Sequence, residues 1–181
     1  GSKVVLGPGT GLGVAALVPG SAGWAAAIGE GGHVTLAAST VEESQVIERL
    51  RERYGHCSAE RILSGPGIAA LAEALGYGAQ SPETVGEWIT SGDARGTHTV
   101  RVFAELLATV ASDLALTFDA RGGVYLGGGI LPKLGPAFPV AAFNARFVAK
   151  GRCAKYLSAV PVARIVRPHP AFAGLLRWRQ G

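Results

Sequence analysis

Three short runs of strand-forming residues, separated by residues typical of tight turns, occupy the first 29 positions of the chain. Val4-Val5-Leu6 leads into a glycine cluster, Gly13–Val18 ends at Pro19-Gly20, and Trp24–Ile28 ends at Gly29. Short β-branched and apolar runs joined by glycine and proline are typical of neighbouring antiparallel strands. The chain is therefore expected to begin with a three-stranded antiparallel meander.

Helical patterns replace the strand pattern after residue 40. Thr40 is followed three residues later by Glu43, which is a capping box, and predicts a helix over residues 41–53. The strongest pattern predicts a helix over residues 97–118, because its apolar residues recur at steps of three and four. Shorter helices are expected after Ser58 with an end at Ser64–Gly67, over Ile68–Leu75, after Ser81-Pro82, and over Ala171–Trp178.

Two further strands are expected in the second half of the chain. Val124–Leu126 is a buried-strand pattern that follows Gly122-Gly123, and Pro161–Val166 is the last such run. Three strands, then helices, then strands separated by helices predict an α/β fold with a mixed sheet. This order of elements does not by itself identify a function.

The composition fits one domain. The chain has 181 residues, 48% of them apolar, and no unbroken apolar run of 18 residues, so no membrane association is expected. Cys57 and Cys153 lack the spacing of a zinc or redox motif, and we interpret them as small apolar side chains in a reducing cytoplasm. Methionine is absent, and Gly1-Ser2 is interpreted as the remnant of a removed tag, with residues upstream cut away.

The charge of the chain is unevenly distributed. The net charge is +4, Asp119 is the last acidic residue, and ten Lys or Arg residues follow it. Such a bias is compatible with a nucleic acid partner, or with a field suited to nucleotide phosphates or an acidic segment elsewhere in the protein. The basic residues are scattered and no aromatic residues are interleaved to stack on bases, which favours the second interpretation. No nucleic acid partner is expected.

The glycine cluster Gly7–Gly13 is the first candidate binding motif. Glycines between two strands let backbone N–H groups face an anion, and the Thr10 hydroxyl adds a donor. A tight hairpin turn would need glycine as well. The Gly-Lys-Ser/Thr of a Walker loop is absent, and the dinucleotide pattern fails both in spacing and because a strand follows it.

Two acidic segments are the next candidates. Glu30 and His33 lie among glycines, where a carboxylate and an imidazole suit the hydroxyl groups of a polar ligand, or simply form a solvated turn. One Glu and one His are too few ligands for a metal site. Glu60 stands in the first turn of the helix expected after Ser58, where its ordinary role is to stabilise the helix dipole.

The order of four motifs, GPGTGLG, GEGGHV, SAERILSGPG and YLGGGILPK, resembles the bacterial glucokinase family. That family belongs to the actin and sugar-kinase superfamily, and the resemblance covers the whole chain after Gly1-Ser2. It implies an actin/hexokinase-like, ribonuclease H-like α/β fold, a mixed sheet flanked by helices, of which this chain is the large lobe only. It also implies ATP-dependent phosphorylation of glucose to glucose 6-phosphate, with Mg²⁺ bound through the nucleotide phosphates, and a possible homodimer.

The resemblance implies roles for matched positions. Gly9, Thr10 and Gly11 would form a phosphate loop facing ATP. Glu30 and His33 would bind glucose hydroxyls, and Glu60 would bind the sugar near its anomeric end. The adenosine side would be lined by Gly127, Gly128 and Gly129, and the turn Ser64–Gly67 would lie near the nucleotide.

The chain departs from the family pattern in one respect. Members carry an N-terminal DxGGT phosphate loop and an Asn-Asp pair whose Asp is the general base, and neither occurs here. No catalytic residue is therefore assigned to this chain. Residues 3–168 are expected to be the large domain, with a terminal helix in 169–181 that packs on an absent small domain, and the chain alone is expected to be inactive.

Two alternatives stay open. One is a sugar-binding regulator of the related repressor and kinase family, although Cys57 and Cys153 do not form the Cys-rich zinc motif those proteins usually carry. The other is a kinase for a different hexose, because epimers differ only in the placement of one hydroxyl group.

Overall fold

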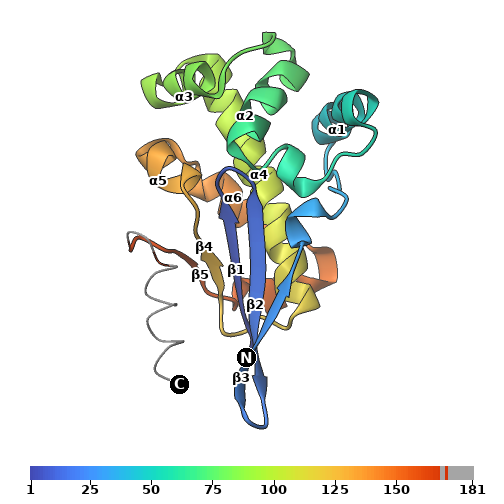
Figure 1. Ribbon diagram of the computed structural model, residues 1–181, viewed down its shortest axis with the longest axis vertical. Helices are drawn as coiled ribbons and strands as arrows, with labels where there is room; N and C mark the ends of the chain where they lie inside the picture. Colours follow the sequence, from blue (N-terminus) through green and yellow to red (C-terminus); the bar gives the residue numbers. More distant parts are fainter. Residues whose placement is uncertain (168–169, 171–181) are drawn as a thin grey trace.

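The computed structural model describes residues 1–167 and Pro170, and its centre is a five-stranded sheet in the order β3-β2-β1-β4-β5 (Figure 1). β1 (Lys3–Pro8), β2 (Leu12–Gly20) and β3 (Gly23–Gly29) are antiparallel neighbours. β4 (Val124–Leu126) pairs parallel to β1, and β5 (Val162–Arg164) pairs parallel to β4. The predicted meander and the mixed sheet are both confirmed.

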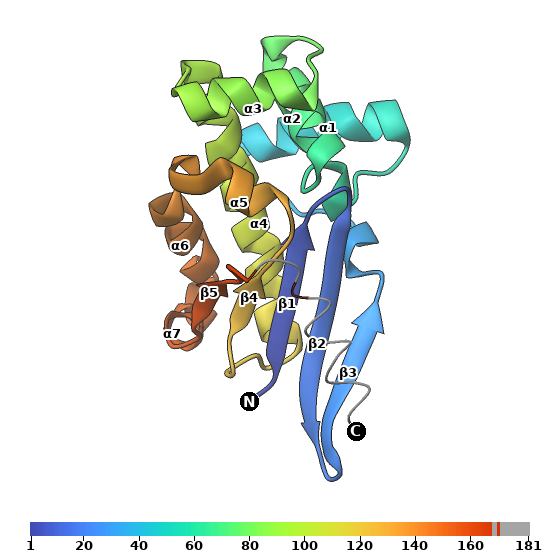
Figure 2. The same ribbon diagram turned by 60° about the vertical axis from the view of Figure 1, so that its left-hand side comes forward.

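Helices cover one face and one end of this sheet (Figures 1 and 2). The long α4 packs along the sheet against α6, while α1, α2 and α3 gather at the end where the β1–β2 turn lies. No helix in the described part of the chain combines the length and hydropathy needed to cross a membrane. The helices are α1 (Val41–Tyr54), α2 (Gly65–Ala72), α3 (Pro82–Ser91), α4 (Ala94–Thr117), α5 (Ile130–Leu134), α6 (Val140–Val148) and α7 (Ala154–Ser158).

Shorter helical turns connect these elements. A wider turn, η3 (Glu73–Tyr77), follows α2 directly, and the others are 3₁₀ turns. The 3₁₀ turns are η1 (Gly31–His33), η2 (Ala59–Arg61), η4 (Gly135–Ala137) and η5 (Gly151–Cys153).

The core lies between the sheet and α4. Val4 and Leu6 are fully buried while the intervening Val5 is 36% exposed, so alternate residues of β1 face the helices. On α4, Phe103 and Leu107 are fully buried, as the spacing of apolar residues predicted. The core therefore packs against the β1–β2 hairpin, whose turn lies at one end of the sheet.

Capping residues explain where three helices begin. The Thr40–Glu43 capping box is present at the start of α1, and Ser81 caps α3 by accepting from the Thr84 amide, both as predicted. The start of α4 was predicted at Thr97, which is three residues too late. The Asp93 side chain accepts from the Arg95 amide at 2.8 Å and so starts α4 at Ala94.

The prediction for residues 58–76 was partly wrong. Only the 3₁₀ turn η2 follows Ser58, and Ser64 begins α2 instead of ending a helix. The Ser64 hydroxyl accepts from the Gly67 amide at 3.1 Å, and Pro66 in the first turn has no N–H to satisfy. Helices α5, α6 and α7 were not predicted, and the terminal helix expected over residues 171–178 lies outside the described residues.

Candidate functional site

The turn between β1 and β2 carries Gly9, Thr10 and Gly11, the predicted phosphate loop. Within it, the Gly9 amide donates to the Gly11 carbonyl at 2.7 Å. The Gly9 carbonyl accepts from the amide of Gly65, the first residue of α2, also at 2.7 Å. The turn therefore lies against the N-terminus of a helix, where N–H groups and the helix dipole favour an anion.

Glu60 is bonded directly to this turn. It lies in η2, and its Oε2 accepts from the Leu12 amide at 2.8 Å, across 48 residues of sequence. A Cβ on Gly11 would lie 2.4 Å from the same oxygen, so only glycine lets the carboxylate approach. Glu60 is therefore more than a first-turn acidic residue that stabilises a helix dipole, because it contacts the predicted phosphate loop.

Glu30 and His33 lie beside Glu60. His33 Nε2 is 3.8 Å from Glu60 Oε1 and 3.8 Å from Glu30 Oε2. Their side chains are largely open to solvent, with 90% of Glu30 and 59% of His33 exposed, whereas Glu60 is 32% exposed. The three predicted sugar-binding side chains therefore gather around one partly open point, with Glu60 the most deeply placed.

A short pairing of two segments sets the distance between His33 and Glu60. Thr35 and Ser58 form an isolated antiparallel bridge, two residues from His33 and from Glu60 respectively. The Ala59 amide donates to the Val34 carbonyl at 3.0 Å, which extends this pairing. α1 lies in the stretch of chain between these two paired segments. The pairing therefore brings together the side chains of His33 and Glu60, which are 27 positions apart in the sequence.

The glycines around His33 serve close packing. A Cβ on Gly32 would lie 2.2 Å from the Leu12 carbonyl oxygen, and one on Gly31 would lie 2.9 Å from Val14 Cβ. The loop therefore lies directly on β2. The absence of side chains at Gly31 and Gly32 lets the backbone lie tightly against the strand.

Gly127, Gly128 and Gly129 follow β4 and lie beside the first glycine turn. The Gly127 amide donates to the Leu6 carbonyl at 2.9 Å. Gly128 has a positive φ of 82°, and a Cβ there would lie 2.2 Å from the Pro8 carbonyl oxygen, so glycine is required twice over. Gly129 has open space where a Cβ would stand. The two predicted glycine segments thus form one continuous surface.

Two pockets border this surface. One, of about 390 Å³, lies between α2, α3 and α5 next to Gly65, with Ile68, Ile130 and Leu134 as apolar walls and Lys133 among its lining residues. A smaller one, of about 150 Å³, is lined by Gly127, Gly128 and Arg164 among others. Among residues 1–167 and Pro170, no three His, Cys, Asp or Glu side chains are grouped as metal ligands.

Comparison with known proteins decides the family. The family model described as Glucokinase matches residues 1–180. The chain belongs to the glucokinase family. The glucokinases of Paramagnetospirillum magneticum and Ralstonia nicotianae are each 46% identical to it, over 94% and 96% of this chain and 56% of each relative. The chain thus spans about half the length of the curated relatives it matches.

Solved structures agree with this glucokinase assignment. The crystal structure of glucokinase from an Antarctic psychrotroph is 34% identical, with a TM-score of 0.84 over 92% of this chain and 54% of that chain. Glucokinase from Balamuthia mandrillaris in complex with glucose has a TM-score of 0.78 at 20% identity, over 92% of this chain and 50% of that chain, and so supports the fold alone. The predicted actin-like α/β fold is confirmed by these neighbours.

Sequence reasoning missed several contacts of this glucokinase-family site. It did not find the Leu12 amide as a partner of Glu60, or the Gly65 amide as the anchor of the glycine turn. Both are backbone groups, which carry no residue signature. Lys133 had a usable signal, because it follows the GGGILP segment directly and is the first basic residue after the triple glycine.

Proposed function

We propose that this chain supplies the glucose-binding and ATP phosphate-binding surfaces of an ATP-dependent glucokinase. The observation that carries the proposal is the position of Glu60. Its Oε2 is bonded to the Leu12 amide beside the glycine turn, and its Oε1 faces His33. One side chain thereby joins the surface suited to a sugar to the surface suited to a phosphate.

The sugar surface has complementary hydrogen-bonding groups. The carboxylates of Glu30 and Glu60 accept hydrogen bonds from hydroxyl groups, and the His33 imidazole donates or accepts. The 3.8 Å separations of His33 from both carboxylates leave the three groups without direct hydrogen bonds to one another. They are therefore available to bind adjacent hydroxyls of one hexose and to orient it.

The proposed phosphate-binding turn ends at Gly11, the residue before Leu12, whose amide donates to Glu60. We assign Gly9, Thr10 and Gly11 to the phosphates of ATP, because the turn abuts the N-terminus of α2. The adenosine would occupy the 390 Å³ pocket next to Gly65, against its apolar walls. Gly127, Gly128 and Gly129 would lie on the adenosine side between that pocket and the turn.

The contribution of this chain to phosphoryl transfer is positioning. ATP supplies the γ-phosphoryl group, and Mg²⁺ bound to its phosphates would neutralise developing charge. Glu30, His33 and Glu60 hold the hexose so that its hydroxyl faces the glycine turn. We assign no general base to this chain, because the Asn-Asp motif of the family does not occur in its sequence.

The wider organisation is part of the same proposal. We propose that residues 3–168 form the large domain of a two-domain kinase. The terminal segment 169–181, expected to pack on the small domain, lies outside the described residues apart from Pro170. The relatives that the chain matches are nearly twice as long, which supports this division. A cytoplasmic location and a homodimer remain predictions.

Calorimetric titration of the chain with glucose tests the sugar site. Wild-type chain is expected to bind glucose saturably, and His33→Ala and Glu60→Gln to bind about tenfold more weakly or not at all, because each variant loses or weakens a hydrogen bond to a sugar hydroxyl. Glu73→Gln is the matched control, since Glu73 pairs with Arg53 away from the site. Tighter binding of another hexose would favour the alternative kinase.

A chimera tests the phosphoryl-transfer half of the proposal. This chain replaces the matched 56% of the Paramagnetospirillum magneticum glucokinase, and ATP- and glucose-dependent formation of glucose 6-phosphate is measured. The chimera is expected to be active, and the same chimera with Glu60→Gln is expected to be inactive. A folded chimera without activity, together with no glucose binding by the chain, would reject the proposed function.

A further inference from the structure

The segment between the sugar-binding loop and α1, residues 34–40, connects the candidate site to the interior of the protein. At its start it pairs with the segment before Glu60, where the Leu36 amide donates to the Cys57 carbonyl at 3.0 Å. His33 immediately precedes it. A displacement of this segment would therefore move His33 relative to Glu60.

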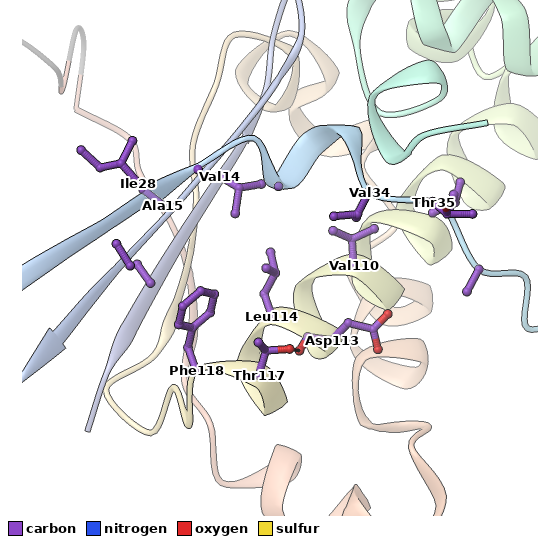
Figure 3. A pocket seen from close by; sticks show the side chains of 16 residues that line it. Val14, Ala15, Ile28, Val34, Thr35, Val110, Asp113, Leu114, Thr117 and Phe118 are labelled. Carbon is purple, nitrogen blue, oxygen red and sulfur yellow. Dashed lines mark hydrogen bonds between the residues drawn. The ribbon is translucent and has the colours of Figure 1, made fainter. Parts of the chain in front are cut away.

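Packing supports this segment weakly on one side. A cavity of about 370 Å³ lies between it, β2, β3 and α4. Figure 3 shows Val34 and Thr35 at the end of the cavity nearest Val110, with Phe118 toward the other end. Side chains bordering unfilled space lack dispersion contacts on that side. Leu36 is buried in the core, but Val34 is 54% exposed, so packing holds the segment on one side only and its hydrogen-bonded ends contribute to its position.

The far end of the segment is held by a buried carboxylate. Glu43 is fully buried, and its Oε2 accepts from the Ser39 amide at 2.6 Å and the Thr40 amide at 3.2 Å. Its other oxygen, Oε1, is 2.5 Å from Arg146 Nη1 on α6, and only 12% of the Arg146 side chain is exposed. Arg146 Nη1 also lies 3.4 Å from Thr109 Oγ1 on α4.

The capping box of α1 does not require the ion pair between Glu43 and Arg146. A neutral glutamine at the same position completes a capping box equally well. Burying a carboxylate and a guanidinium costs desolvation free energy, which a merely local cap would not need. Glu43 and Arg146 are 103 residues apart, so their pair joins the segment to α6.

We infer that the buried Glu43–Arg146 pair is a positioning device for the sugar site. By fixing residues 39 and 40 to α6, it holds residues 34–40 over the cavity and sets the approach of His33 to Glu60. This inference rests on the proposed function for its consequence on glucose, but the anchoring itself is independent of any ligand. Neither residue is one of the proposed sugar-binding side chains.

Two measurements on the folded chain test the inference. Amide hydrogen exchange without ligand reports the anchoring, and the glucose dissociation constant reports its consequence. Glu43→Gln keeps the capping box but removes the charge, and Arg146→Met removes the partner. Both are expected to speed exchange in residues 33–40 more than elsewhere and to weaken glucose binding by about 2- to 30-fold.

Matched variants separate positioning from general destabilisation. Glu42→Gln is the control, because Glu42 is the neighbouring carboxylate of α1 and pairs with His98 and Arg101 without bonding to residues 34–40. It is expected to leave exchange in residues 33–40 and glucose affinity unchanged, with a smaller loss of thermal stability because its ion pairs are partly exposed. Arg146→Lys keeps a cation and is expected to restore most of both properties.

The outcomes distinguish this inference from the proposed function. If wild-type chain binds no glucose, the proposed sugar site fails, while selective exchange in residues 33–40 of the Glu43 and Arg146 variants still supports the anchoring. If wild-type chain binds glucose and these variants match Glu42→Gln in exchange and affinity, the positioning role is overturned. If Glu43→Gln does not fold, the comparison of Arg146→Met with Arg146→Lys decides in the same way.

Discussion

At the scale of single residues, the glycines of the site differ in what they require. Gly11 does not have a positive φ, and its absent side chain matters only because the Glu60 carboxylate occupies that space. Gly128 combines a positive φ with a close carbonyl neighbour. At Gly13, two residues after Gly11, a Cβ would have no heavy atom of another segment within 4 Å. Residue type alone cannot separate these three cases.

Gly11→Ala is therefore expected to weaken glucose binding while Gly13→Ala leaves it unchanged. The new methyl group would stand 2.4 Å from Glu60 Oε2 and push the carboxylate off the Leu12 amide. The loss of a charge-assisted hydrogen bond predicts a dissociation constant about tenfold higher or more. Calorimetric titration of both variants measures it, and equal affinities would show that Glu60 does not depend on this contact.

At the scale of elements, charge decides where α4 begins. Asp93 caps the helix, and Arg95 returns to it with Nε 3.0 Å from Oδ1 and Nη2 2.8 Å from Oδ2. Hydrogen bonds from the Arg95 side chain first, and then from its backbone amide, lower the pKa of Asp93 to about 2. The apolar periodicity begins only at Val100, so it could not show this earlier start.

The pKa of Asp93 provides a pH-dependent prediction. Because its folded pKa lies below the usual 3.8, the stabilisation by the ionised cap is complete above about pH 4 and is lost as the pH falls through about 2. A carboxyl carbon titration followed by NMR should give a midpoint near 2 for Asp93. In Arg95→Gln the midpoint should rise toward its usual value, and a wild-type midpoint near 3.8 would contradict the bidentate contact.

At the scale of the whole molecule, α4 joins the layers. It contacts α3, α6 and the sheet, and Phe103, Leu106 and Leu107 on it are fully buried. The site itself lies at the end of the sheet, formed by the β1–β2 turn, η1, η2 and the start of α2. The stability of the site therefore depends on the core around α4, to which Glu30, His33 and Glu60 do not belong.

Phe103→Ala is expected to lower the free energy of unfolding by about 3–5 kcal/mol, because it removes a fully buried ring and leaves a cavity. Leu116→Ala on the same helix is the control, since Leu116 is 37% exposed and should cost much less. Urea unfolding followed by circular dichroism measures both. Similar losses for the two variants would place the core elsewhere than along this face of α4.

The sequence by itself determined the elements whose signals are local. The three-stranded meander, the capping box at Thr40, the N-cap at Ser81 and the apolar face of α4 all depend on residues within a few positions of one another. The ordered motifs also pointed to the glucokinase family, which the comparisons confirm. The short helices α5 to α7 were missed, because segments of five to nine residues carry too little periodicity.

Only the tertiary structure decided how the candidate site is assembled. It joined Glu60 to the Leu12 amide, the glycine turn to the Gly65 amide, and Glu43 to Arg146 across 103 residues. It also showed that Gly31 and Gly32 allow close packing on β2. The physical reason is that backbone donors and empty Cβ positions carry no residue signature, so the partners they meet are set by the fold and not by local sequence.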